Sequence, residues 1–555
     1  MKKIYLIGLV LLLAAILVLG SCAEETTTTT TTAPPPTSTT TTKPPTSTTT
    51  TQPPTSTTTT KPPAVTPTGT IRIANPDFSY ESTDPVDYES FWGWSMYDAL
   101  LNFDDKGVIT PNVAESFNLD AAGVWTFKIR KDIKFHNGDP LTAADVKFSV
   151  DRFGDMSLSK NPWSLYISDG YNKVSSRVVD DYTFEFTSAR PEPAQAIAFA
   201  WTRILPKKYF ESVGQDAFRD KPVGSGPWKF VEHIEETSFK MEANTSYWGQ
   251  VPAYQYVLDI QVPEQSTRVA MLKAGDVDIA LGVDFDRIAD LESLGFRTQR
   301  IGFPTVTNIN FQGTWLQTAG PTRDIRVRQA MSFALNRQEI CDTWFQGYAE
   351  PGGQWFMHKG SYGYTDALAA DPYDLAKAQA LLVEAGYPGS FTDPTIHIYT
   401  TAAAQDYVLV LLGYWEEAGL QVKMEILDAA IWGGYFFNFT RLKGGEQNVG
   451  WIFPWTFGSY FNSTYHCANM YTSVGTHNTA NDPKADAMYK AATSELDPVK
   501  AEKLWADFQV YARSLYVDVG VAEIDPLIMV GPELGKFTGK TWVSLNDCLA
   551  GIQHP

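Results

Sequence analysis

The sequence predicts an α/β protein with two or more domains. Helical and strand patterns alternate in the second half of the chain, which indicates helices packed on a sheet. At 555 residues the chain is longer than one typical core supports, so more than one core is expected. A hydrophobic content of 43% and an aromatic content of 13% are typical of an ordered globular protein.

The first 22 residues have the pattern of a targeting segment. Lys2 and Lys3 precede an apolar run, Ile4–Leu19, and the segment ends in Gly20-Ser21-Cys22. Small residues before a cysteine resemble a bacterial lipobox. We therefore expect cleavage before Cys22 and a lipid on Cys22, which would hold the protein at a membrane surface. The alternatives are an ordinary signal peptide and an uncleaved anchor.

Residues 23–69 form a threonine- and proline-rich segment of low complexity. The octet Pro-Pro-Thr-Ser-Thr-Thr-Thr-Thr occurs at Pro35–Thr42, Pro44–Thr51 and Pro53–Thr60. Almost no apolar side chain is present, so the segment cannot form a core and is predicted to be disordered. Proline pairs favour extended conformations, which predicts a semi-stiff tether.

The clearest local pattern after the first predicted strand, Ile71–Ala74, lies within Tyr97–Arg152. Val124–Arg130 alternates apolar and polar residues, which predicts a strand with one buried face. A turn signal follows at residues 137–140, and Thr142 with Asp145 forms a capping box before a helix. The stretch contains no obvious nucleophile or metal site.

Further elements follow from the same periodicities. The predicted strands are Tyr182–Phe186 and Val422–Ile426, and the predicted helices are Pro321–Trp344, Asp374–Ala385, Tyr407–Ala418 and one that Asp497 caps. In the first of these helices, Arg326 and Arg328 lie beside an apolar stripe and are interpreted as structural salt-bridge partners.

Several motifs resemble, in order and spacing, the signature of the extracytoplasmic solute-binding proteins of the peptide/nickel class. The resemblance covers about residues 71–555. The matching pieces are Tyr97–Leu101, Val113–Phe117, Trp125–Arg130, Lys134–Gly138, Thr142–Val146, Val223–Phe230, Asn244–Gly249, Arg268–Ile279, Pro321–Ala330 and Leu335–Arg337.

The resemblance implies a two-lobed periplasmic-binding-protein fold with a hinge and an extra small subdomain, of the cluster C type. One lobe would comprise residues 70–103, 189–308 and 520–555, the small subdomain 104–188, and the second lobe 309–519. The implied function is a lipid-anchored, extracytoplasmic and monomeric receptor. It would capture a small molecule or peptide between its lobes and deliver it to the permease and ATPase of an ABC importer, without a catalytic residue or cofactor.

The stretch Asn448–Tyr460 is the most informative for the ligand. In peptide-binding members a Gly-Trp pair is followed by Ala-Asp, and the Asp pairs with the α-ammonium group of the ligand. Here Gly450-Trp451 is followed by Ile452-Phe453-Pro454, so the anchoring carboxylate is missing and ordinary peptide binding requires another one.

Aromatic residues stand in place of this carboxylate, and flat rings stack on sugars and attract organic cations. We expect Trp451 and Trp455 to line the cleft, with Phe457 and Tyr460 as further candidates. Trp92 and Trp94, in the aromatic run Phe91–Tyr97, are candidates too, although such a run is also typical of a buried helix start.

The ligand class stays open between an oligopeptide, an oligosaccharide and a nickel chelate. A net charge of −19 without a basic stripe argues against nucleic acid as a partner. Alternatives from other classes are a surface glycoside hydrolase, which needs two facing carboxylates, and a sensory receptor of the same fold without an importer.

Three cysteines remain after Cys22, namely Cys341, Cys467 and Cys548. In an oxidising compartment we expect one disulfide and one buried thiol, and Cys341, in an apolar helix, is the expected thiol. Only His466-Cys467 is a close pair of metal-binding residue types, so no structural metal site is predicted.

Overall fold

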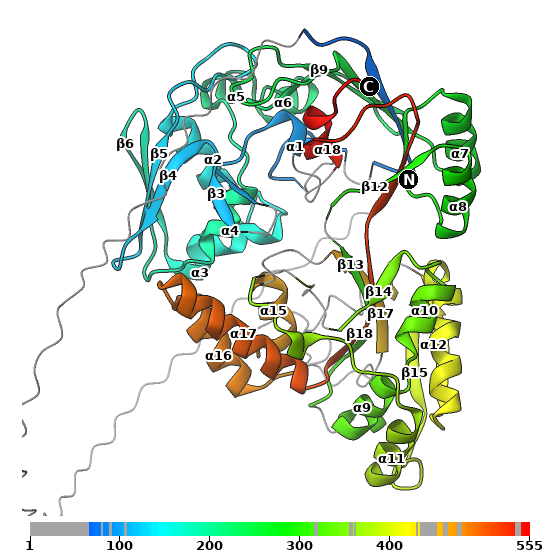
Figure 1. The fold of residues 1–555 in the computed structure, drawn as a ribbon. Helices are drawn as coiled ribbons and strands as arrows, with labels where there is room; N and C mark the ends of the chain where they lie inside the picture. The colour runs from blue at the N-terminus through cyan, green and yellow to red at the C-terminus, as the bar shows by residue number, and fades with distance from the viewer. Residues whose placement is uncertain are drawn as a thin grey trace, which may run out of the picture. The chain divides into compact units, whose positions relative to one another are not determined.

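We describe a computed structural model of the chain (Figure 1). It describes residues 66–78, 81–87, 92–104, 108–302, 304–315, 320–353, 359, 362–428, 431–432, 452–458, 464–473, 480–538 and 545–555. The predicted targeting segment, with Cys22, and nearly all of the predicted tether lie outside these residues.

The first lobe contains a seven-stranded sheet in the order β12-β19-β11-β1-β10-β9-β8. Its middle strand β1 runs parallel to β10 and β11, and the remaining pairs are antiparallel. The strands are β1 Thr70–Asn75, β8 Trp228–Ile234, β9 Ser238–Ala243, β10 Tyr256–Gln261, β11 Ile279–Ala280, β12 Arg297–Arg300 and β19 Leu527–Val530.

Alternation along β1 explains how this sheet is covered on both faces. Ala74 packs with Leu272 of α7 (Gln265–Ala274) and Ile288 of α8 (Phe285–Ser293), the two helices beside the sheet in Figure 1. Ile71 and Ile73 point to the opposite face. That face packs against a second core, which includes Trp92, Phe239 and Met241.

The second lobe contains a six-stranded sheet in the order β14-β18-β13-β17-β15-β16. The strands are β13 Thr305–Phe311, β14 Ala349–Pro351, β15 Ile396–Thr401, β16 Val422–Leu427, β17 Ile452–Gly458 and β18 Asp518–Ile524. One face packs against α9 Ile325–Phe333, α10 Arg337–Thr343, α11 Leu375–Ala385 and α12 Gln405–Glu417. The other packs against α15 Thr464–Tyr471, α16 Pro483–Ser494 and α17 Pro498–Ser514.

A separate four-stranded sheet, in the order β4-β5-β7-β6, is formed by residues 114–187. Its strands are β4 Ala114–Leu119, β5 Val124–Ile129, β6 Ser175–Asp180 and β7 Thr183–Thr187, and α2 (Ala143–Gly154) packs against β6 and β7. Trp125, Phe127 and Ile129 are buried, which confirms the predicted one-sided strand. The Thr142–Asp145 capping box is present, with the Thr142 backbone N–H donating to Asp145 at 2.9 Å.

The chain crosses between the two large sheets from β12 to β13 and from β18 to β19. The crossings lie side by side, because the Ile301 backbone N–H donates to the Pro526 carbonyl at 2.9 Å. Arg300 and Asp525 form an ion pair of 3.0 Å at the same place. Two mixed sheets linked by adjacent crossings form a two-lobed α/β fold, as the sequence predicted.

The prediction of one long helix over Pro321–Trp344 is wrong. The chain forms a 3₁₀ turn (Gly320–Arg323), then α9 and α10. The Asp324 and Asn336 side chains accept hydrogen bonds from the backbone N–H groups of Arg326 and Glu339, so each begins a new helix. Buried apolar residues continue at helical spacing across the break, so periodicity alone predicts one continuous helix.

The two arginines of this region are structural, as predicted. Arg326 forms an ion pair with Asp324 at 2.6 Å. Arg328 is buried and donates to the backbone carbonyls of Thr322, Leu515 and Tyr516 at 2.6–2.8 Å. It therefore links the start of α9 to the end of α17. Among the described residues it forms no ion pair, so the prediction of a salt bridge is wrong for Arg328.

The predicted disulfide among the three cysteines does not form. Cys341, Cys467 and Cys548 are each buried in a different core cluster, so their sulfurs cannot meet. Burial raises the pKa of the Cys341 thiol to about 12, which makes it an unreactive core residue.

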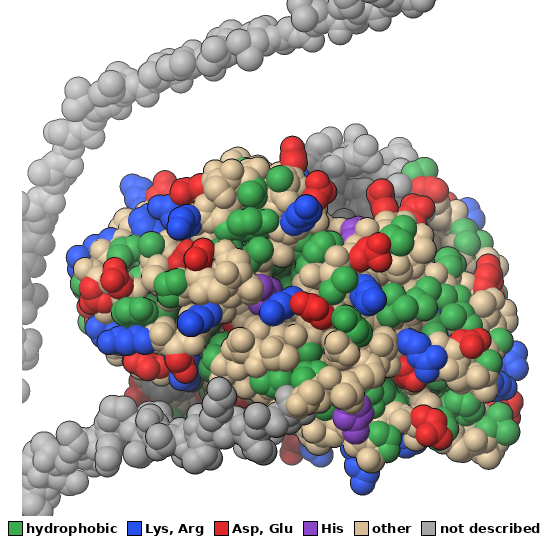
Figure 2. All heavy atoms as spheres, turned by 90° about the horizontal axis from the view of Figure 1, so that it is seen from above, with side chains coloured by type: hydrophobic (Ala, Val, Ile, Leu, Met, Phe, Trp, Pro, Cys, Tyr) green, Lys and Arg blue, Asp and Glu red, His purple; other side chains and the backbone are tan. Residues whose placement is uncertain are grey.

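Acidic and basic side chains are mixed over the face in Figure 2.

Within the described residues, none of the helices combines the length and apolar character that crossing a bilayer requires.

Candidate functional site

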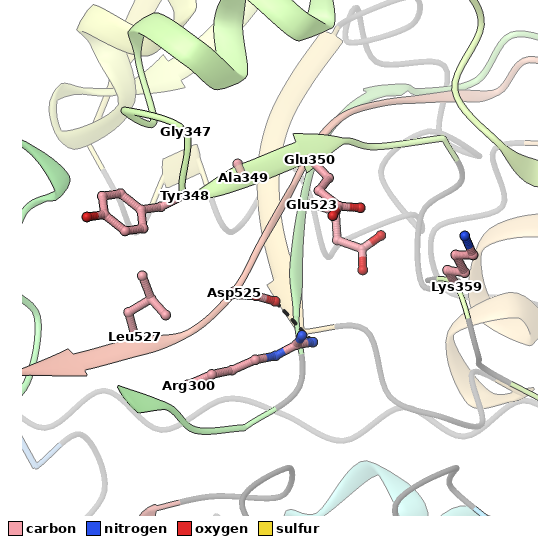
Figure 3. Close-up of a pocket in the computed structure, with 9 residues that line it drawn as sticks. All are labelled: Arg300, Gly347, Tyr348, Ala349, Glu350, Lys359, Glu523, Asp525 and Leu527. Carbon is pink, nitrogen blue, oxygen red and sulfur yellow. Dashed lines mark ion pairs between the residues drawn. The ribbon is translucent and has the colours of Figure 1, made fainter. Parts of the chain in front are cut away.

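A cavity of about 300 Å³ lies where the chain crosses between the lobes (Figure 3). Arg300 and Leu527 reach it from β12 and β19 of the first lobe. Glu350 and Glu523 reach it from β14 and β18 of the second, and Asp525 lies in the crossing itself. A site lined by both lobes at their connection is where rotation of one lobe would change the geometry of bound groups.

Strand register brings two of these carboxylates together. On the antiparallel strands β14 and β18, Glu350 lies directly opposite Glu523. In Figure 3 both side chains extend into the same space, while the Asp525 carboxylate turns to Arg300 at 3.0 Å. Like charges on opposed strand positions destabilise the pair, so this arrangement has an energetic cost without a counter-charge.

When all of its charged groups are ionised, the cavity lining is acidic, because it carries three carboxylates and only two cations, Arg300 and Lys359. Burial raises the pKa of Glu523 to about 7, and the neighbouring Glu350 and Asp525 add to this effect against Arg300. Burial also raises the pKa of Asp525, although Arg300 opposes it. Near pH 7 Glu523 is therefore only about half ionised, and the excess of negative charge in the cavity, which attracts cations, develops as the pH rises above this value.

Part of the predicted aromatic site lies outside the described residues. Trp451 and Tyr460 lie outside the described residues. Trp455 and Phe457 lie on β17, where the backbone pairs them with Asn308 and Val306 of β13. Pro454, at the place of the missing carboxylate, pairs with Ile309. Contact of these aromatic residues with a ligand stays a prediction.

Trp92 is a core residue in this conformation. Its side chain is fully buried and its ring stacks on Phe239 with centroids 3.8 Å apart. The indole N–H donates to the Asp259 carboxylate at 3.3 Å. This environment favours the alternative of a buried helix start over direct contact with a ligand.

Trp94 is only partly buried. The guanidinium of Arg203 lies 3.6 Å from the ring centroid, and Trp201 packs edge-on at 4.9 Å. One face of the ring is therefore used by a cation–π contact. Its contact with a ligand also stays a prediction.

The sequence analysis missed the acidic cavity and also Asp259. Glu350 is far in the chain from Glu523 and Asp525, and only the pairing of β14 with β18 brings it beside them. Asp259 lies on a strand in which buried and less buried residues alternate, and its carboxylate stands at a position that faces the core. A charged residue at a core position of a predicted strand is a feature by which the sequence could have identified it.

Three comparisons with known proteins bear on this architecture. The family model of bacterial extracellular solute-binding proteins, family 5 (middle), matches residues 108–481. The chain is 27% identical over 340 residues to the glutathione-binding protein GsiB of Salmonella choleraesuis. That alignment covers 60% of this chain and 64% of the relative, so the chain spans somewhat less than two thirds of the relative's length.

Solved structures share the fold over most of the chain. NikA from Brucella suis, in complex with Fe(III)-EDTA, aligns with a TM-score of 0.76 and 20% identity, covering 88% of this chain and all of NikA. DppA from Helicobacter pylori, in complex with the peptide STSA, aligns with a TM-score of 0.70 and 21% identity, covering 88% and 98%. The chain belongs to the family of bacterial extracellular solute-binding proteins, family 5.

Proposed function

We propose that this protein captures a solute between its two lobes outside the cytoplasm and delivers it to the permease and ATPase of an ABC importer. One observation carries the proposal. Two sheets, each with its own hydrophobic core, are joined by two adjacent crossings of the chain, and a cavity beside these crossings is lined by residues of both lobes. Such a connection allows the lobes to close on a ligand, and ligand binding then favours the closed state. Membership of the family supports binding over the glycoside hydrolase alternative.

The solute is of the peptide class, with an oligosaccharide or a metal chelate as alternatives within the same family. Glutathione, a peptide and a metal chelate are the ligands that the names of similar proteins give. The acidic cavity favours solutes with a positive group over anionic ones. The aromatic stretch around Trp451 and Trp455 would stack on flat or apolar parts of the solute.

The protein is held at the outer side of the cell membrane by a lipid on Cys22. Residues 23–69 then act as the tether, which reaches on the order of 100 Å when extended at about 3.1 Å per residue. This length would let a monomeric binding domain collect solute away from the membrane and return to its permease.

Native mass spectrometry of the gently purified full-length chain tests the proposal. We expect a small molecule to remain bound and to be released on unfolding, where it can be identified. In the producing bacterium, deletion of the gene should then abolish uptake of that same molecule. A protein that carries no solute, together with unchanged uptake of peptides, sugars and chelates in the deletion strain, would contradict the proposal.

A further inference from the structure

A second polar group lies at the carboxyl ends of the parallel strands β1 and β10. The strands pair so that Asn75 lies beside Gln261 and Ile73 beside Asp259. Asn75 donates from its amide nitrogen to an Asp259 oxygen at 3.4 Å, and the Trp92 indole donates to the same oxygen at 3.3 Å. The carboxyl edge of parallel strands is where open α/β sheets bind ligands.

Two oxygen atoms of this group lack donors. Asp259 is only 1% exposed, yet its second carboxylate oxygen has no hydrogen-bond donor among the described residues. The buried side-chain oxygen of Gln261, two residues along the same strand, has none there either. Side chains two apart on a strand share a face, so both acceptors belong to the same face of β10. Leaving both buried without donors is costly.

Asp84 and Asp98, two other buried carboxylates of this lobe, have donors on both oxygens. The buried Glu192, which has one oxygen without a donor, pairs through the other with Arg190. Asp84 forms an ion pair with Arg152 at 2.8 Å. Asp98 accepts from Tyr247 at 2.9 Å and from Trp248 at 3.0 Å. Among the described residues, no cation forms an ion pair with Asp259. Asp259 therefore lacks, among the described residues, the paired cation that Asp84 and Glu192 each have.

The raised pKa of Asp259 also indicates that a positive group is missing beside its carboxylate. Burial raises its pKa to about 7, against the hydrogen bonds from Trp92 and Asn75 and a smaller effect of the Ile260 backbone N–H. The His233 ring lies 5.3 Å from the Trp92 ring, and the His233 imidazole pairs with Glu81 at 2.6 Å. A positive group beside Asp259 would restore the ionised form at neutral pH.

We propose that Asp259 and Gln261 form a subsite that anchors a primary ammonium group of the bound solute. An ammonium group carries three N–H donors, and two of them would satisfy the two orphaned oxygens. Ca²⁺ and Mg²⁺ fit less well, because each takes six or more ligands, mostly oxygens, and only two oxygens are offered. The inference rests on the proposed binding function. It assigns to Asp259 the role of the carboxylate that Pro454 cannot supply.

Thermal unfolding of the full-length chain at pH 8 tests the subsite with small probes. Methylammonium chloride offers N–H donors, tetramethylammonium chloride offers the charge without donors, and sodium chloride matches the ionic strength. We expect methylammonium to raise the Tm of the wild type above both other salts. Asp259→Asn should have a higher Tm than the wild type in sodium chloride and should lose the response to methylammonium.

Asp98→Asn is the matched control, because Asp98 is a buried carboxylate of the same lobe with donors on both oxygens. It should lower the Tm and keep the methylammonium response. The inference is overturned if the wild type responds equally to all three salts, if Asp259→Asn keeps the response, or if Asp259→Asn lowers the Tm.

Native mass spectrometry separates this inference from the proposed function. If Asp259→Asn still carries the solute found in the wild type, the protein binds solute and Asp259 is not its anchor. If the solute is lost from Asp259→Asn and kept by Asp98→Asn, the subsite is supported in the intact protein.

Discussion

Glu350 and Glu523 lie directly opposite each other on β14 and β18, at the point where the chain crosses between the lobes. Two carboxylates on opposed strand positions repel each other when both are ionised. The same strands could pair with any neutral or oppositely charged residues at these positions. The repulsion is therefore a property of these side chains and not of the fold.

Glu350→Gln should raise the free energy of unfolding at pH 8 by about 0.2–1 kcal/mol, because it removes a like-charge pair across the strands. Chemical denaturation at fixed pH measures the change. Glu232→Gln is the matched control: Glu232 lies opposite Lys240 on antiparallel β8 and β9, so its neutralisation should lower the stability. Equal effects of the two variants would show that strand register does not set these energies.

Glu523→Gln should flatten the dependence of stability on pH. The folded-state pKa of Glu523, about 7, lies above that of an unfolded chain, so the folded state binds more protons between these values. The contribution of this group to stability is thus fully present at low pH and is lost as pH rises through about 7. Tm values of wild type and variant between pH 4 and pH 8 measure it. Parallel curves would rule out this ionisation.

Asp84→Asn should destabilise the protein by about 3–5 kcal/mol, because it leaves a buried guanidinium without its counter-charge. The side chains of Asp84 and Arg152 are 0% and 10% exposed, and they meet at 2.8 Å. Asp507→Asn is the control, since its ion pair with Lys503 is solvent-exposed on one helix and should contribute well under about 1 kcal/mol. Urea denaturation of both variants gives the comparison, and a small loss in Asp84→Asn would contradict the expectation.

Gly224→Ala should prevent stable folding. A Cβ atom at Gly224 would lie 2.0 Å from the carbonyl oxygen of Met96, a backbone atom that cannot move aside. Gly170→Ala is the control, because its Cβ would meet nothing within 4 Å and the residue lies in a short helix. Soluble yield and circular dichroism distinguish the two. A well-folded Gly224→Ala would show that this segment tolerates a shift.

Trp451→Ala and Trp455→Ala should each weaken binding of the solute that co-purifies with the protein and leave the Tm of the ligand-free protein nearly unchanged. The reason is that rings that line a cleft contribute more to the ligand than to the core. Isothermal titration with the identified solute measures the affinity. An affinity equal to that of the wild type would remove that residue from the site.

Much of the local structure could be predicted because its causes are local. The one-sided strand β5 follows from alternation, and α2 follows from Thr142 and Asp145, three positions apart. The break between α9 and α10 was missed although Asn336, at the break, is a residue that commonly caps helices, as is Asp324 at the start of α9. The apolar stripe predicts one continuous helix, whereas in the structure the capping hydrogen bonds of Asp324 and Asn336 each begin a new helix.

By itself, the sequence determined the family, the α/β class and most helices and strands, since periodicity, caps and motif spacing are properties of neighbouring residues. Only the tertiary structure decided which distant side chains meet. It placed Glu350 opposite Glu523, put the three cysteines in separate cores, and buried Asp259 with no ion-pair partner among the described residues. The physical reason is that charge repulsion, disulfide geometry and desolvation depend on distances in space, which strand pairing and packing set.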